Sequence, residues 1–104
     1  MWIGVGASNN TIGGTVAGAG NVIGGSAYAG IEINGTGTTG NKIQGNFIGT
    51  NSTGTMNLAN GGNGVLLIGG ASNNTIGGVT AGAGNTIAFN AFAGVALQDK
   101  RNDR

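Results

Sequence analysis

The chain has 104 residues, of which 25 are glycine and none is proline, cysteine or histidine, and its formal net charge is +1. Long helices are disfavoured because each interior glycine costs a helix roughly 1 kcal/mol relative to alanine. Disulfides, thiolate metal sites and histidine acid–base chemistry are excluded. The charge gives no basic patch for nucleic acid, and no window approaches the ~18 consecutive apolar residues of a membrane span.

Two short motifs alternate along the chain and predict short strands bounded by glycine and asparagine. One motif is Asn-x-Ile and the other is Gly-Ile/Val-x-Ile/Leu. In chain order, the apolar anchors of the predicted strands are Ile3, Ile12, Ile23, Ile33, Ile43, Leu58, Leu67, Ile76, Ile87 and Leu97, with a further short strand at 46–48. No helical period fits such isolated apolar residues. Chains rich in glycine and asparagine are also typical of disordered linkers, but the regular apolar spacing opposes that interpretation.

The chain repeats itself, because residues 7–14 recur letter for letter at 71–78, an offset of 64 residues. The similarity continues from 17–21 to 81–85 and from 27–33 to 91–97. Self-similarity at a fixed offset is the signature of stacked units. An antiparallel sandwich also uses short, evenly spaced strands, but its strands have no need to resemble one another. We therefore predict an all-β parallel β-helix of about three coils.

Coil length is open between two readings of the 64-residue offset: two coils of about thirty-two residues with three strands each, or three coils of about twenty-one with two. We prefer three strands per coil, because like motifs then stack on like. This choice predicts three apolar columns, namely Ile3–Ile33–Leu67–Leu97, Ile12–Ile43–Ile76, and Ile23–Leu58–Ile87. Asparagines at the corners are expected to bond from rung to rung and to tolerate left-handed backbone.

Two stretches are expected to loop outside the column, 35–40 and the longer 51–63. At the ends, Trp2 is expected to cover the first coil. Charged side chains are concentrated in the last six residues, since only Glu32 and Lys42 are charged before them. We therefore predict a β-helix domain over 1–98 and a charged tail over 99–104. The first residues lack the basic region and apolar run of a signal peptide, so no export signal is expected in this chain.

Residues 30–35, 40–50 and 71–78 resemble the parallel β-helix repeats of large bacterial and archaeal surface and secreted proteins. The resemblance covers nearly the whole chain, from Ile3 to Leu97. It implies a right-handed coil and an extracellular or cell-surface setting. It leaves function open, because such repeats serve adhesive stalks, fibres and polysaccharide-acting enzymes alike.

Catalytic and cofactor chemistry has little support in the sequence. Glycosidic hydrolysis generally needs paired carboxylates, and Glu32 is the only carboxylate before the tail. Glu32 and Lys42 are expected to face outward and to form at most an exposed ion pair. Fragments such as Gly-Val-Gly at 4–6 lack a phosphate-loop context, and the turns carry asparagine where a calcium-binding repeat needs aspartate. We predict no enzyme, no cofactor and no metal site.

Two sets of surface residues are candidate sites. Glycosylation sequons begin at Asn9, Asn34, Asn51 and Asn73, and Asn51 is expected to be the best placed because it lies on the long loop. An outward threonine face is expected from Thr11, Thr75 and Thr86. Flat ranks of threonine on a β-solenoid order water in several ice-binding proteins, although Val22 and Lys42 stand at equivalent positions and would interrupt the rank.

The ends of a short stack leave unpaired strand edges, and each edge is a template for another chain. Because the first and last coils have nearly the same sequence, we expect head-to-tail association into dimers or filaments. The predicted function is therefore a non-enzymatic structural or adhesive module. The alternatives are an ice-binding solenoid and a polysaccharide-binding or polysaccharide-processing β-helix. The carbohydrate alternative needs a groove with aromatics, and the Tyr28/Phe92 pair is expected to pack locally instead.

Overall fold

A computed structural model describes residues 1–98, and the predicted charged tail lies outside the described residues. This part of the chain contains ten short strands and no helix. The strands are β1 (Trp2–Gly4), β2 (Thr11–Gly13), β3 (Val22–Ile23), β4 (Ile31–Asn34), β5 (Lys42–Gln44), β6 (Phe47–Ile48), β7 (Val65–Ile68), β8 (Thr75–Ile76), β9 (Thr86–Ile87) and β10 (Val95–Leu97). Accordingly, no helix of membrane-spanning length and hydropathy occurs in residues 1–98.

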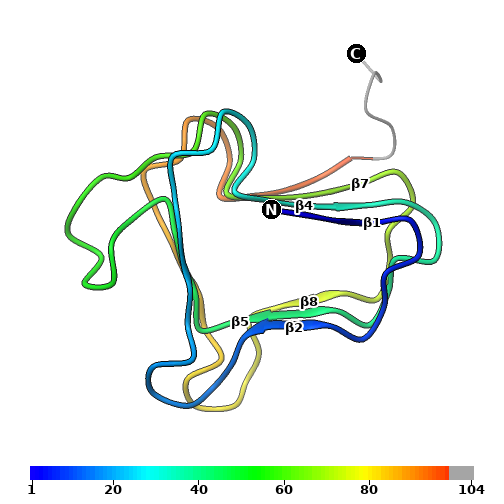
Figure 1. Ribbon diagram of the computed structural model, residues 1–104, viewed down its shortest axis with the longest axis horizontal. Helices are drawn as coiled ribbons and strands as arrows, with labels where there is room; N and C mark the ends of the chain where they lie inside the picture. The colour runs from blue at the N-terminus through cyan, green and yellow to red at the C-terminus, as the bar shows by residue number, and fades with distance from the viewer. Residues whose placement is uncertain (99–104) are drawn as a thin grey trace.

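The strands form three parallel sheets that make the three walls of a solenoid of about three turns (Figure 1). The sheets have the strand orders β1-β4-β7-β10, β2-β5-β8 and β3-β6-β9. We call β1–β3 the first coil, β4–β6 the middle coil and β7–β9 the last coil; β10 begins a fourth. The prediction of three strands per coil is confirmed, as is the parallel β-solenoid itself. The right hand of the coil and the extracellular setting stay predictions.

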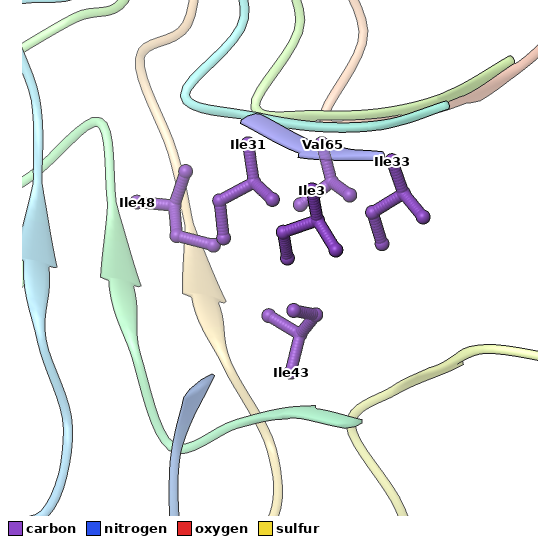
Figure 2. Packing of buried hydrophobic residues seen from close by; sticks show 6 residues of the cluster. All are labelled: Ile3, Ile31, Ile33, Ile43, Ile48 and Val65. Atoms are coloured by element: carbon purple, nitrogen blue, oxygen red, sulfur yellow. The ribbon is translucent and has the colours of Figure 1, made fainter. Parts of the chain in front are cut away.

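The register superposes like residues, as expected. Ile3, Ile33, Leu67 and Leu97 are successive partners in the four-stranded sheet, and Ile12, Ile43 and Ile76 are partners in the second sheet. The side chains of Ile3, Ile33 and Ile43 point into the space between the walls (Figure 2). In this space Ile31, Ile33, Ile43, Ile48 and Val65 have no exposed surface. The interior is therefore a continuous aliphatic column.

The third column corrects one prediction. Ile48, from β6, lies between Ile23 and Ile87, so the prediction of Leu58 at this place is wrong. Leu58 instead follows a loop that leaves the wall after β6, extends sideways (the green loop at the left of Figure 1) and returns where the Leu58 N–H bonds to the Gly49 carbonyl. A turn of only two residues separates β5 from β6. The extra residues of the middle coil lie in the loop after β6, so that its total length remains close to that of the other coils.

Both stretches predicted as loops outside the column are partly in the wall. In the stretch 35–40, Thr38 is fully buried and Thr39 bridges both Ser8 and Ser72. In the stretch 51–63, Asn60 is fully buried, and Gly62 joins a rung-to-rung hydrogen-bond series. The lateral protrusion is therefore shorter than predicted, and residues from Asn60 onward belong to the corner.

Trp2 does not cover the open end of the first coil. It is the register partner of Glu32 on the outer face of the four-stranded sheet, while Ile3 faces inward. Its indole folds back over Gly4, where an added Cβ would lie 2.3 Å from the ring. Trp2 thus packs along the outer wall, and the prediction of an aromatic cap is wrong.

Candidate functional site: the asparagine ladders, the two ends and an outer groove

Three ladders of asparagine side chains run along the corners of the solenoid. Each ladder is named after the sheet whose strands follow its asparagines in the chain. In the order given next, they are the second-sheet ladder, the third-sheet ladder and the first-sheet ladder. Their members are Asn10–Asn41–Asn74, Asn21–Asn46–Asn85, and Asn60–Asn90 with Ser26 at the corresponding place in the first coil. Residues 41, 46 and 60, all in the middle coil, are essentially fully buried.

The third-sheet ladder shows the repeating geometry. Both the backbone N–H and the Nδ2 of Asn21 donate to Oδ1 of Asn46, at 2.9 and 3.1 Å. Asn46 in turn donates to Oδ1 of Asn85 in the same two ways, at 2.9 and 3.2 Å. The second Nδ2 proton of Asn46 bonds to the Ile12 carbonyl at 2.9 Å. Every hydrogen-bonding atom of this buried amide is therefore used.

The other two ladders repeat this pattern. Asn41 accepts from Asn10 and donates to Asn74, and Asn60 donates to Asn90. The predicted rung-to-rung asparagine bonds are confirmed. The first-sheet ladder was not predicted, because neither Asn60 nor Asn90 stands in an Asn-x-Ile motif.

The ladders are polar, because in every bond between two asparagine side chains the earlier coil donates and the later coil accepts. At the first coil, Oδ1 of Asn10 and of Asn21 therefore has no donor within residues 1–98. At the last coil, Asn74, Asn85 and Asn90 each bond one Nδ2 proton to a carbonyl of the preceding coil. Their backbone N–H groups and second Nδ2 protons have no acceptor among the described residues. One end of the stack thus presents acceptors and the other presents donors.

A groove lies outside the four-stranded sheet and has two exposed aromatic side chains on its rim. Tyr28 and Phe92 are 80% and 73% exposed. They lie two coils apart, because Gly62 donates to the Tyr28 carbonyl and Phe92 donates to the Gly62 carbonyl. The expectation that they pack locally is therefore wrong. The described lining of this ≈ 630 Å³ hollow is Tyr28, Ala29, Glu32, Gly61, Gly62, Asn63, Leu66, Ile68, Phe92 and Gln98.

The three predicted threonines are all exposed, but they do not form one face. Thr11 and Thr75 share an outer column of the second sheet with Lys42 between them. Thr86 lies in the third sheet, in a column with Phe47 and Val22. The interruption by Lys42 and Val22 expected from the sequence is present in the register, and the threonine rank is split over two walls.

The two charged side chains of the body lie on different sheets, Glu32 in β4 and Lys42 in β5. Glu32 accepts a hydrogen bond of 2.9 Å from Nδ2 of Asn34. Within residues 1–98 there is no group of three or more histidine, cysteine, aspartate or glutamate side chains that could hold a metal ion.

The four sequon asparagines fall into two pairs. Asn9 and Asn73 are exposed and have positive φ angles of 58° and 56°, as predicted for corner asparagines. Asn34 and Asn51 are half-buried and engaged. Oδ1 of Asn51 accepts from Thr53, Thr55 and Met56, so this side chain organises the loop in which it lies. Use of any sequon stays a prediction, and the structure favours Asn9 and Asn73 over Asn51.

Comparisons of this chain with protein-family models, curated proteins and solved structures find no significant match.

Proposed function

We propose that this chain is a non-enzymatic structural module of an extracellular or cell-surface protein, and that its copies associate end to end. The observation that carries the proposal is the polarity of the asparagine ladders. The last coil offers unused donors at Asn74 and Asn85, and the first coil offers unused acceptors at Asn10 and Asn21. Each buried rung-to-rung amide bond within the chain supplies a template for the bond that two copies would form.

The ends of the aliphatic column support the same proposal. Ile12 and Ile23 at one end, and Ile76 and Ile87 at the other, are only partly buried although they continue the buried column. A second copy stacked in register would cover these side chains with their own equivalents. Apolar burial contributes about 25 cal/mol per Å², so association through the ends gains from the column as well as from the ladders.

The same substitution at the two ends tests the proposal. Asn85→Asp keeps the oxygen that accepts from Asn46 but removes the unused donor and places a negative charge against the acceptor of the incoming Asn21. Asn21→Asp leaves an acceptor at the opposite end. We expect Asn85→Asp to weaken association at least tenfold and Asn21→Asp to change it by less than threefold, measured by sedimentation equilibrium.

Circular dichroism and urea unfolding of both variants control for folding, because each substitution also removes one donor within the chain. Equal weakening by the two variants would contradict association through polar ladder ends. A strictly monomeric wild-type chain at millimolar concentration would remove the self-association proposal altogether.

A second candidate function is carbohydrate binding in the outer groove. It is favoured by the two exposed aromatic rings, which lie two rungs, and so about 9.6 Å, apart along the wall with Gly62 between them. Aromatic faces separated in this way can contact the two C–H faces of one sugar ring, and Glu32, Asn63 and Gln98 supply polar groups nearby.

Retention on insoluble polysaccharides tests the second candidate, with cellulose, chitin and polygalacturonate as probes. Tyr28→Ala and Phe92→Ala should each abolish retention. The matched control is Phe47→Ala, which removes an aromatic side chain from a different sheet. Retention that survives both groove variants would contradict this candidate.

A further inference from the structure

The two ends of the solenoid do not match in strand number. The four-stranded sheet begins with β1 and ends with β10, whereas each of the other sheets has three strands. In a second copy stacked so that its β2 pairs with β8, its β1 falls in the layer that β10 already occupies. If its β1 instead lay beyond β10, the new β2 would be two rungs, about 9.6 Å, from β8. The asparagine ladders bond over a single rung, so they would not close across that gap.

The two competing strands differ in how well they are held. In β1, Ile3 is 7% exposed, and the terminal ammonium of Met1 donates to the Gly30 carbonyl at 2.7 Å. In β10, Leu97 is 77% exposed and Val95 is 48% exposed. Ala96 and Leu97 lie beside Leu66 and Leu67 of β7, in the same columns in which Trp2 and Ile3 lie beside Glu32 and Ile33 of β4. β1 therefore offers the same wall position a larger apolar surface.

We propose that an incoming copy docks by displacing β10 and pairing its own β1 with β7. The inference rests on the proposed end-to-end association, and it names the strand that joins and the strand that leaves. The interface then consists of β1, β2 and β3 of one copy on β7, β8 and β9 of its neighbour. In this arrangement all three sheets continue from one copy to the next without a gap. The second-sheet and third-sheet ladders continue in the same way. Until it is displaced, β10 closes the end of the first sheet.

Disulfide trapping distinguishes displacement from docking onto β10, and the chain has no native cysteine to interfere. In the double variant Trp2→Cys with Leu66→Cys, the two positions are two rungs apart within one chain, beyond the ~7 Å Cα separation that a disulfide spans. They become adjacent only when β1 of one copy lies beside β7 of another. We expect this variant to form covalent dimers and longer species on mild oxidation.

The comparison variant is Trp2→Cys with Ala96→Cys, which would cross-link only if the incoming β1 lay beyond an undisplaced β10. Cross-linking of this variant, without cross-linking of the Leu66 variant, would overturn the inference. If the wild-type chain associates in sedimentation but neither cysteine variant cross-links, the inference is also overturned, while the proposed function stands. A chain that does not associate in any form would instead remove the proposed function and this inference together.

A pair of proline variants gives an independent readout. The Gln98 N–H donates to β7 at Leu67, and the Gly94 carbonyl accepts from Val65, so by alternation the Ala96 N–H faces β7 and the Leu97 N–H faces away. Ala96→Pro should loosen β10 and tighten association about tenfold. Leu97→Pro should leave β10 paired and association unchanged within about twofold. Tightening by neither variant, or loss of association in Leu97→Pro alone, would contradict displacement.

Discussion

The middle coil and the two outer coils share the same short wall motifs but differ in environment. Ile43 and Ile48 of the middle coil have no exposed surface, whereas Ile12, Ile23, Ile76 and Ile87 above and below them are only partly buried. The same holds for the ladders, where the buried asparagines are all in the middle coil. Each coil covers its neighbours, so a coil's contribution to stability depends on how many neighbours it has.

Backbone strain follows the same division. Within residues 1–98 the residues other than glycine with positive φ are Val5, Asn9, Asn73 and Phe89, and all four lie in the first or last coil. The middle coil uses glycine at such places, for example Gly40 between Asn9 and Asn73. A Cβ at Gly40 would lie 2.3 Å from Oδ1 of Asn9. A side chain in left-handed backbone is tolerated where it can reach solvent, and excluded where a coil lies above.

The largest expected effect of this difference is in the aliphatic column. Ile43→Ala should lower the free energy of unfolding by about 3–4 kcal/mol, because the lost methyl groups leave a cavity between two packed coils. Ile76→Ala, in the same column of the last coil, should cost about half as much. Urea unfolding followed by circular dichroism measures both. Equal losses would mean that the outer coils are covered in solution, and sedimentation would show whether a second copy covers them.

The next effect is in the third-sheet ladder. Asn46→Ala leaves the N–H of Asn21 and the carbonyl of Ile12 without their partner, and we expect a loss of roughly 2–3 kcal/mol from unsatisfied buried groups. Asn21→Ala, at the exposed end, should cost less than about 1 kcal/mol. The measurement is again urea unfolding, with unchanged m-values as the check on folding. If Asn21→Ala lowered the free energy of unfolding more than Asn46→Ala does, burial would not determine how much each ladder asparagine contributes to stability.

The wall positions were predictable because stacking makes like residues coincide. The Asn-x-Ile and Gly-Ile/Val-x-Ile/Leu motifs each specify one wall, and the 64-residue repeat specifies that they are superposed. What failed was the assumption of equal steps. The outer coils have their loop between the second and third sheets, at 14–20 and 78–84, whereas the middle coil has its loop after the third sheet. Because outward loops cost little, loop position does not follow from spacing, and spacing alone predicts Leu58 where the structure has Ile48.

The ends and the groove were only partly predictable for a related reason. Open strand edges follow from any short stack, but their donor and acceptor polarity depends on which way each amide turns. The exposure of Tyr28 and Phe92 follows from the glycine that stands between them in the middle coil, and the sequence predicts residue 62 in a loop. Both features depend on which residues share a rung, and the spacing of the motifs does not specify this for the middle coil.

The smallest effect concerns the strain at the first coil. Val5 is β-branched, has a φ of 55° and is 86% exposed, so it holds a left-handed conformation that costs an ordinary residue about 1–2 kcal/mol with little burial in return. Val5→Gly should raise the free energy of unfolding by about 0.5–1 kcal/mol after the greater entropy of the unfolded glycine is counted.

Val16→Gly is the matched control, since Val16 is also exposed in the first coil and is not among the residues with positive φ. It should be neutral or destabilising, because it adds the entropy cost without relieving strain. A loss of stability in Val5→Gly would show that the valine is held by a contact at the open end, as a stacked neighbour would provide.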